Sequence, residues 1–524
     1  MKKIVQQHWL TYGWTILLSA ASAVLFSLFS IQLGAVIDVV VHQEADFAQK
    51  IGRCGLMALL ASFVSMFYVY AKSKNISGII QDVKKEVVRA LNRKEISDYQ
   101  CKSNEYYLNN LTKNIDILKE NYLSPRCEII SEILTAIVTL CFLFSIHWKL
   151  CLYFIGISLL VMALSQLPGK LMAKKTHEFS EKNAEYLKMA NNYLHGFEQM
   201  KLLGLSALFF HRYQDQDRRF EQSRFSYMFV TEAASYLGMF FSFFAQLACM
   251  SVGVWFALKG EITVGLLIAA VNLLNSVFNP IRMVAQYKNL MGTTDEIRQD
   301  LDVILAEPEK QGGKLVGPIR TIDLKDLSLQ FGDEKVLFDH YDLHFSGHQK
   351  YAIVGESGRG KSTLMKLVMK YYQRDAYQGQ VLVNGQAVET LASDALYQRI
   401  AYIQRNDFYL AGTVEENIAL GRDLPDEQAL YQKLKFTEAF LQKPIEAGSR
   451  NQVSTGEKQR IDMARFLVKD YEVLIFDEPT SNLDPETSRI VFDLILGIEN
   501  KMVIVITHVN EVTILDRFDE VIRL

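Results

Sequence analysis

The sequence has little of what marks disulfide-bonded, zinc-binding or nucleic-acid-binding proteins. Its six cysteines lie in the first half of the chain without Cys-x-x-Cys spacing, which argues against a disulfide framework and a zinc site. We interpret them as free thiols in apolar helices. A formal net charge of −3 leaves no basic excess, so we expect no nucleic-acid partner. No peptidase-like region of cysteine and histidine precedes the apolar segments, so we do not expect cleavage of a leader peptide.

Apolar residues are abundant instead, and in the first part of the 524-residue chain they form long runs. The first run follows Met1-Lys2-Lys3 and resembles a signal peptide, but it continues to Val41, which is long enough to span a bilayer. For any single run the alternative is a buried helix of a soluble protein, which six runs in one chain disfavour. The six predicted transmembrane helices are 14–41, 54–71, 129–146, 150–167, 233–258 and 262–285.

The connections between these predicted helices alternate in length. Residues 42–51, 147–149 and 259–261 form short links, whereas 72–128 and 168–232 are long, polar and rich in lysine and arginine. The positive-inside rule therefore places the long connections and the N-terminus in the cytoplasm. A helical repeat within both long connections predicts that the membrane helices continue beyond the bilayer, with ordinary loops as the alternative.

A few polar or aromatic residues within the predicted spans are candidate functional groups. Asp38, Glu128 and Glu132 lie near span ends, so we interpret them as water-facing residues, with functional intramembrane carboxylates as the alternative. The fifth span carries an aromatic cluster at 239–244. Such a cluster lines a cavity for an apolar or amphipathic substrate or faces lipid and neighbouring helices, and the sequence leaves both open.

The second half of the chain changes character. Residues 286–317 turn polar, which marks a linker, and 321–330 and 349–354 have the apolar patterns of strands. We therefore predict a multidomain membrane protein, with a six-helix α transmembrane domain followed by an α/β P-loop nucleotide-binding domain. The predicted boundaries are 1–300 for the transmembrane domain, 301–316 for the linker and 317–524 for the nucleotide-binding domain.

A glycine-rich loop follows the second of these strands and precedes a helix-compatible stretch at 364–370. Its pattern, Gly-x-x-x-x-Gly-Lys-Ser, is typical of loops that bind nucleotide phosphates, although a glycine-rich surface turn is the alternative for the loop alone. Backbone N–H groups would surround the phosphates, Lys361 would reach the β- and γ-phosphates, and Ser362 would ligate Mg²⁺. The residues predicted to bind ATP here are Gly355, Glu356, Ser357, Gly358, Arg359, Gly360, Lys361, Ser362 and Thr363.

Two further apolar strands end in residues that suit phosphate chemistry. The run 473–476 ends in Asp477 and Glu478, as a buried parallel strand presents acids at its carboxyl edge. Asp477 would hold Mg²⁺ and Glu478 would polarise the attacking water. The run 502–506 is followed by Thr507 and His508, which predicts an imidazole at the same edge.

With residues 453–460, Val-Ser-Thr-Gly-Glu-Lys-Gln-Arg, these motifs resemble the ATP-binding cassette (ABC) transporters. The resemblance covers nearly the whole chain and is closest to an exporter half-transporter, in which the membrane domain precedes the nucleotide-binding domain. It implies ATP and Mg²⁺ as cofactors. It also implies that the 453–460 signature of one chain closes over the phosphate loop of another, so the chain would work as a dimer in the plasma membrane, with cytoplasmic ATPase domains.

The resemblance assigns roles to single residues. Gln404 looks like the glutamine that senses Mg²⁺, and His508 looks like the switch histidine that contacts the γ-phosphate. Phe331 stands in the place of the aromatic that stacks on adenine, with a packed core side chain as the alternative. Ser454 and Gly456 would approach the γ-phosphate, and Asp484 would lie in the loop linking the two ATP sites. The implied catalytic residues are Glu478, His508, Gln404 and Lys361, and the implied Mg²⁺ ligands are Ser362, Gln404 and Asp477.

Two departures from the family pattern stand in the signature. Thr455 replaces a glycine, and a β-branched residue tolerates positive φ poorly. Glu457 replaces a glutamine. We therefore expect a working but weakened composite site, which would suit an asymmetric heterodimer. By resemblance, coupling helices would lie near 106–111 and 192–197.

The expected function is ATP-driven export, with a second half-transporter, membrane lipid and the transported substrate as partners. The signature resembles variants in bacterial exporters of small peptides, which implies a small peptide as substrate, and amphipathic drugs or lipids are the alternative. A non-transporting regulatory membrane ATPase is the second hypothesis, which the retained catalytic residues disfavour. An importer is disfavoured because importers usually place their membrane and ATPase domains on separate chains.

Overall fold

The computed structural model describes residues 1–42, 46–165, 167–306, 312–331, 335–404, 408–422, 427–446, 453–481, 483, 485–508 and 511–524. Within them the chain forms two compact units. One comprises Met1–Val87 and Leu108–Leu305, and the other comprises Val88–Tyr107 and Ala306–Leu524. The segment Val88–Tyr107, which the sequence places in the transmembrane domain, thus groups with the C-terminal unit. Residues 307–311 of the predicted linker lie outside the described residues.

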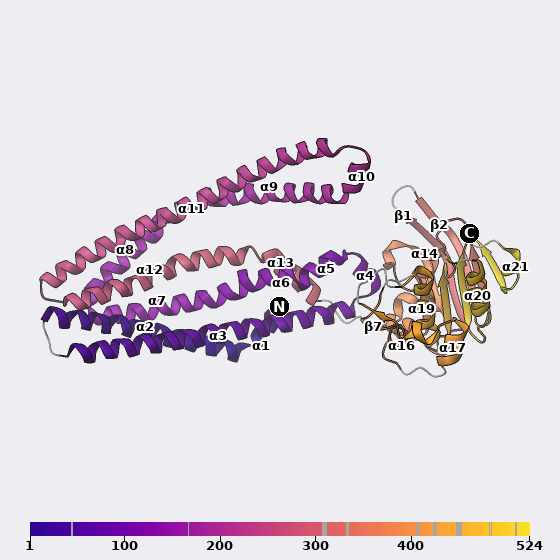
Figure 1. Cartoon of the computed structure of the whole chain (residues 1–524), viewed down its shortest axis with the longest axis horizontal. Coiled ribbons are helices and arrows are strands. Elements are labelled where there is room, and N and C mark those ends of the chain that lie inside the picture. Colours follow the sequence, from indigo (N-terminus) through magenta and orange to yellow (C-terminus); the bar gives the residue numbers. More distant parts are fainter. Residues whose placement is uncertain are drawn as a thin grey trace. The chain divides into compact units, whose positions relative to one another are not determined.

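The first unit consists mainly of long helices, joined by a few short ones (Figure 1). Their sequences contain few prolines, which removes the main cause of helix breaks; α12 does contain Pro280. A π-helical turn at Lys119–Leu123 joins α6 to α7. The helices are α1 (Lys2–Gln7), α2 (Trp9–His42), α3 (Phe47–Arg93), α6 (Lys113–Leu118), α7 (Ser124–Ile146), α8 (Trp148–Ser165), α9 (Gly169–His195), α10 (Phe197–Leu202), α11 (Ser206–Leu258), α12 (Val264–Gly292) and α13 (Asp295–Leu305).

Four helical segments among the described residues are long and apolar enough to cross a membrane: Trp9–Val41, Phe47–Arg93, Asn104–Ile146 and Ser206–Leu258. They contain the first, second, third and fifth predicted spans. The fourth and sixth predicted spans fall in α8 and α12, whose apolar segments Trp148–Val161 and Val264–Leu274 are shorter. The count of six spans is therefore not confirmed, although each predicted span overlaps a helix for most of its length.

The long helices extend well beyond the length that a bilayer requires. With 47 residues, α3 is roughly 70 Å long, more than twice the thickness of a hydrocarbon core. The predicted continuation of membrane helices into the long connections is confirmed for α3, which reaches Arg93, and for α11, which begins at Ser206, whereas residues 177–193 belong to the separate helix α9.

Aromatic rings join α9 to α11 along much of the length of α9. The ring of Phe179 stacks on that of Tyr227, with centroids 5.0 Å apart, and Tyr186 stacks on Phe220 at 4.7 Å. The hydroxyl groups of Tyr186 and Tyr213 share a hydrogen bond of 2.8 Å. These contacts define a two-helix arm, formed by α9 and the facing part of α11.

The carboxylate of Asp38 connects α2 to the start of α12. It accepts hydrogen bonds from the Thr263 hydroxyl at 2.6 Å and from the Gly265 backbone N–H at 2.7 Å. The two helices approach closely here, because a Cβ atom added to Gly34 would clash with the Gly265 carbonyl. Glu128 likewise pairs with Lys72 of α3. Asp38 and Glu128 therefore both bind partners within the unit, in addition to the partial exposure that their interpretation as water-facing residues requires.

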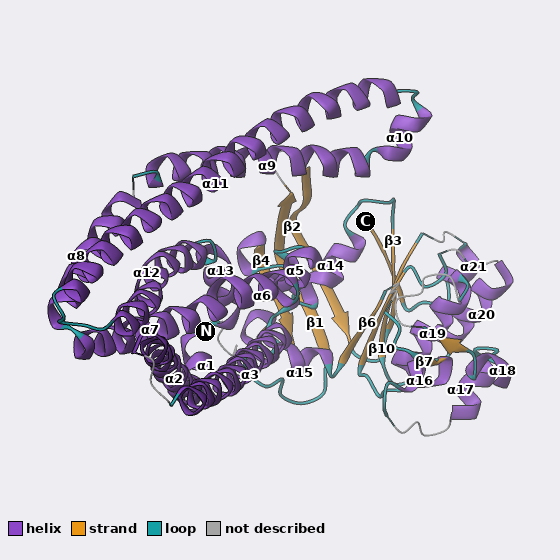
Figure 2. Ribbon diagram, turned by 60° about the vertical axis from the view of Figure 1, so that its left-hand side comes forward, coloured by secondary structure: helices purple, strands orange, loops and turns teal. Residues whose placement is uncertain are grey.

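The second unit contains a five-stranded parallel sheet, in the order β11-β3-β10-β9-β6, and a four-stranded antiparallel sheet, in the order β2-β1-β4-β5 (Figure 2). The predicted strands at 321–330 and 349–354 are confirmed as β1 and β3. The strands are β1 (Thr321–Phe331), β2 (Lys335–Ser346), β3 (Lys350–Val354), β4 (Gln378–Val383), β5 (Gln386–Ala387), β6 (Ile400–Ile403), β7 (Gly412–Thr413), β8 (Pro444–Ile445), β9 (Val473–Asp477), β10 (Met502–Thr507) and β11 (Glu520–Arg523).

Helices cover the parallel sheet on both faces, and β3, β6, β9 and β10 are accordingly buried on both sides, whereas the edge strand β11 is mostly exposed. Along β9, Val473 and Ile475 belong to one hydrophobic cluster, and Leu474 and Phe476 belong to another. Because all five strands run in parallel, their carboxyl ends meet at one edge. The helices are α4 (Ile96–Gln100), α14 (Lys361–Val368), α15 (Ser393–Tyr397), α16 (Val414–Ala419), α17 (Glu427–Lys433), α18 (Glu438–Leu441), α19 (Thr455–Leu467), α20 (Pro485–Leu496) and α21 (Val512–Leu515), with α5 (Asn104–Leu111) crossing the division between the units.

The segment Val88–Tyr107 is held to the rest of the second unit by polar contacts. The Lys370 ammonium donates to the Glu95 carboxylate at 2.8 Å and to the Leu391 carbonyl at 2.9 Å. The Lys370 and Glu95 side chains are only 9% and 16% exposed. Gln373 donates to Asp98 at 3.0 Å. These contacts lie at and just before α4, one helix earlier than the turn at 106–111 predicted for coupling.

All six cysteines are free thiols, as predicted. One of them, Cys101, follows the short helix α4 and does not lie in an apolar helix.

Candidate nucleotide-binding site

The glycine-rich loop lies between β3 and α14, at the carboxyl edge of the parallel sheet. Gly358 and Gly360 have φ values of +80° and +89°, a conformation that glycine adopts without strain. Gly360 is also the residue that precedes α14, where an added Cβ would clash with the Phe338 and Leu337 side chains. The strand, loop and helix predicted from the sequence are therefore present.

The side chain of Lys361 is folded back over this loop. It is buried, and its ammonium donates to the carbonyl oxygens of Gly355 and Glu356, both at 2.8 Å. Burial lowers the pKa of Lys361, although the nearby carboxylates of Glu478 and Asp477 oppose the shift. A buried ammonium whose hydrogen-bond acceptors are neutral carbonyls would gain from an anionic partner, so this residue fits a nucleotide phosphate.

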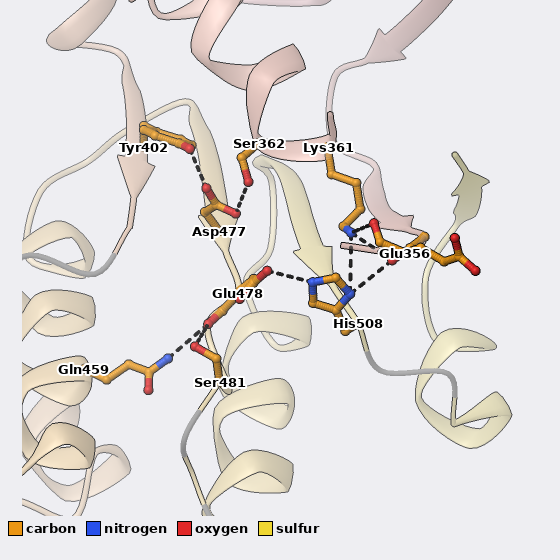
Figure 3. A network of polar contacts seen from close by, with 10 residues as sticks. Glu356, Lys361, Ser362, Tyr402, Gln459, Asp477, Glu478, Ser481 and His508 are labelled. Atoms are coloured by element: carbon orange, nitrogen blue, oxygen red, sulfur yellow. Dashed lines mark hydrogen bonds and ion pairs between the residues drawn. The ribbon is translucent and has the colours of Figure 1, made fainter. Parts of the chain in front are cut away.

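The carboxylate of Asp477, at the end of β9, accepts hydrogen bonds from two hydroxyl groups (Figure 3). Ser362 donates to one oxygen at 2.8 Å and Tyr402, on β6, donates to the other at 2.5 Å. Burial and the adjacent carboxylate raise the pKa of Tyr402, which keeps it protonated and able to donate. A serine hydroxyl touching a carboxylate supplies the hard oxygen ligands that Mg²⁺ prefers, so the residues fit this metal.

Glu478 and His508 face each other in the same site. His508 Nε2 donates to Glu478 Oε1 at 2.8 Å, while Nδ1 lies 3.0 Å from the Gly355 carbonyl oxygen. Glu478 has a φ of +52°, which is strained for a residue with a side chain. Such strain persists only where the surroundings fix the backbone.

Four hydrogen bonds hold the Glu478 backbone in that conformation, one of them from the Ser481 backbone N–H to the Glu478 carbonyl at 3.2 Å. Its N–H donates to the Ile506 carbonyl at 2.9 Å. Its carbonyl accepts from Gln459 of α19 at 3.2 Å and from the Ser481 hydroxyl at 3.1 Å. Gln459 also donates to the Pro479 carbonyl. The signature helix α19 therefore helps to fix the position of the predicted catalytic acid.

Other predicted site residues lie apart from this cluster or outside the described part of the chain. Gln404 follows β6, and its side-chain amide donates to the Tyr371 hydroxyl at 3.4 Å, so Tyr402, not Gln404, contacts Asp477. Phe331 ends β1, and its side chain lies outside the described residues, as does Asp484.

The signature begins a helix, which changes the expectation for Thr455. Ser454 caps α19, and Thr455 is its first residue and is not among the residues with positive φ. The predicted strain at Thr455 is therefore wrong. Glu457 replaces glutamine without loss of capping, because its carboxylate accepts from the Ser454 N–H at 2.8 Å and its own N–H donates to the Ser454 hydroxyl at 3.3 Å.

Sequence reasoning missed the contacts that Tyr402 and Gln459 make in the site. Both depend on which elements become neighbours: β6 pairs with β9, and α19 lies beside the end of β9. The signal available in the sequence was a tyrosine near the end of an apolar strand and a glutamine inside the signature.

Comparison with known proteins identifies the class of protein that this fold and site define. The family model of the ABC transporter transmembrane region matches residues 12–281, and that of the ABC transporter matches residues 338–481. The chain belongs to the ABC transporter family, with the transmembrane and ATP-binding parts fused as in exporter half-transporters.

Relatives of similar length include three bacterial proteins. The chain is 25% identical to an uncharacterized ABC transporter ATP-binding protein, YwjA, of Bacillus subtilis, over 86% of this chain and 82% of the relative. It is 23% identical to an ATP-dependent lipid A-core flippase of Desulfotalea psychrophila, over 90% and 85%. It is 26% identical to a Staphylococcus aureus ATP-binding/permease protein whose name assigns it provisionally to multidrug export, over 84% and 79%.

Proposed function

We propose that the chain is one half of a dimeric exporter, which uses ATP hydrolysis to move an amphipathic compound or a small peptide across the plasma membrane. One observation carries this proposal: a single chain joins membrane-length helices to a site where Lys361, Asp477, Glu478 and His508 converge. The names of two relatives, which refer to lipid A-core and to multidrug export, support amphipathic substrates.

The residues of the site suit phosphoryl transfer from ATP to water. The loop N–H groups and Lys361 would bind the phosphates, and Ser362 and Asp477 would hold Mg²⁺, which neutralises charge on the phosphate oxygens. Glu478 would accept a hydrogen bond from the attacking water and orient it. His508, now bonded to Glu478 and close to Gly355, stands between the acid and the loop and would turn to the γ-phosphate.

The remaining roles follow from the family. Ser454 and Gly456 would complete the ATP site of a second chain, with Asp484 linking the two sites, Phe331 stacking on adenine and Gln404 sensing Mg²⁺. Six spans, a cytoplasmic N-terminus and a cytoplasmic ATPase domain complete the proposed topology. The intact capping of α19 supports a homodimer with two working sites. A heterodimer, or a regulatory ATPase that does not transport, is the second candidate.

The test is ATP hydrolysis by the full chain, purified alone and placed in lipid nanodiscs, with the particle mass measured in parallel. We expect hydrolysis by a species of twice the chain mass. Glu478→Gln should lower the turnover by about 10²-fold or more, the usual effect of losing a general base. Glu499→Gln, at an exposed acid after α20, is the matched control and should leave turnover unchanged. A monomeric or inactive wild-type chain would refute the self-sufficient homodimer and favour a missing partner.

A further inference from the structure

A cavity of about 250 Å³ lies inside the first unit, between α2, α3, α7 and α12. Nine of its eleven lining residues carry a hydroxyl group. The four helices are otherwise strongly apolar, and a hydroxyl group in such surroundings costs free energy unless it finds a partner. So many hydroxyl groups around one cavity therefore indicate a polar occupant.

The hydrogen bonds of the lining show which kind of group it can receive. Ser27, Ser65 and Thr135 each donate their hydroxyl proton to the carbonyl oxygen four residues earlier in the same helix, at 2.8–2.9 Å. Because the proton of Ser65 is used in this way, Ser22 is the donor in the 2.8 Å bond between Ser22 and Ser65. Four hydroxyl groups thus have only lone pairs left for the cavity, and they attract a hydrogen-bond donor or a positive charge.

The carboxylate of Glu128 lies next to one of the residues that line this cavity. Tyr68 lines the cavity, and its hydroxyl donates to one oxygen of Glu128 at 3.4 Å. The other oxygen of Glu128 forms an ion pair with Lys72, one helical turn beyond Tyr68 on α3. Both members of this pair are largely shielded from solvent. Lys72 has a long flexible side chain, so its ammonium can extend along the helix to water if another cation takes its place.

We infer that this cavity binds the protonated amine of an amphipathic molecule. The lining hydroxyl groups accept its N–H bonds, and Glu128 is its counter-ion. Lys72 neutralises Glu128 while the site is free and releases it when the amine enters. Binding of the amine requires neither ATP nor hydrolysis. Only transport of the bound amine would rest on the proposed function.

Binding is measured with nucleotide-free full chain in phosphatidylcholine nanodiscs, by equilibrium dialysis of octylamine against protein-free nanodiscs. Octanol, which has the same chain and no charge, is the comparison ligand. We expect saturable binding of octylamine and none of octanol above the lipid blank. Binding should be displaced by other primary amines and not by sodium or potassium chloride.

Four variants separate the groups involved. Ser22→Ala with Ser65→Ala should weaken octylamine binding about tenfold, the effect of losing a hydrogen bond to a charged group. Lys72→Met with Glu128→Gln, which leaves no unpaired charge, should weaken it by at least as much. Lys72→Met alone should strengthen it, because the competing ammonium is gone. Ser62→Ala removes an exposed hydroxyl with the same type of helix bond and should change nothing.

Two results would overturn the inference directly: equal binding of octylamine and octanol, or unchanged octylamine affinity in the Lys72→Met/Glu128→Gln variant. Competitive displacement of octylamine by sodium ions would also overturn it, because the site would then belong to an alkali cation. Failure of the proposed function looks different. The amine would then bind as expected while ATP hydrolysis is absent or is not stimulated by octylamine.

Discussion

Tyr402 and Ser362 both donate to Asp477, so at the scale of single residues a tyrosine hydroxyl orients the carboxylate proposed to hold Mg²⁺. Partners of metal ligands usually contribute about 10- to 100-fold to metal affinity. We expect Tyr402→Phe to raise the Mg²⁺ concentration needed for half-maximal ATP hydrolysis about tenfold. Turnover at saturating Mg²⁺ should stay close to that of the wild type.

A Mg²⁺ titration of ATPase activity at constant ATP measures this effect. Tyr377→Phe is the matched control, because Tyr377 also donates to a carboxylate, that of Glu389 at 2.5 Å, without being part of the site. If both variants titrate like the wild type, Tyr402 does not position the metal ligand.

At the scale of elements, the first turn of α19 carries the variant signature. Ser454 and Glu457 form reciprocal hydrogen bonds there, and glutamine can make the same bonds as glutamate. We expect Glu457→Gln to be nearly neutral. Glu457→Ala should lower the free energy of unfolding by about 1 kcal/mol and reduce ATP hydrolysis, because the start of the helix frays. Chemical denaturation and ATPase assays compare the two, and equal loss in both would show that the charge of Glu457, not the cap, matters.

The second element-scale prediction concerns the segment before α4. The Lys370–Glu95 ion pair is largely buried, and removing one member of such a pair typically costs about 3–5 kcal/mol, because the other charge is left without a partner. Lys370→Met should therefore destabilise the second unit strongly. Adding Glu95→Gln should recover much of the loss. A double-mutant cycle on thermal unfolding measures the coupling, and additive effects would mean that the two side chains act independently.

At the scale of the whole molecule, the proposed dimer brings the signature of one chain to the phosphate loop of the other. Ser454 and Arg359 are both exposed in the described chain. In the Glu478→Gln background, we expect Ser454→Cys with Arg359→Cys to form a disulfide between chains on oxidation with ATP and Mg²⁺. A band of twice the chain mass on a non-reducing gel reports it, and each single cysteine variant is the control. Cross-linking that is equally efficient with and without ATP would contradict ATP-dependent closure of a composite site.

Features encoded locally could be predicted from the sequence, and features that depend on distant residues could not. The strand, loop and helix around Lys361 follow from contiguous residues, as does the strand that ends in Asp477 and Glu478. The bond between Tyr402 and Asp477 requires the pairing of β6 with β9, and the bond between Glu128 and Lys72 requires that α3 and α7 be neighbours. The prediction of strain at Thr455 failed for a different reason. The capping sequence that begins at Ser454 places Thr455 in the first turn of a helix, and this determines its φ.

The ring contacts between α9 and α11 have a mechanical consequence. A force on the end of a single helix bends it easily. Two helices joined at intervals by stacked rings and a hydrogen bond are stiffer, because bending would have to shift these contacts. The α9 part alone is roughly 40 Å long, so a small rotation at one end becomes a displacement of several ångströms at the other. We therefore expect a movement at α10 to reach the far ends of α9 and α11 with little loss to bending of the arm.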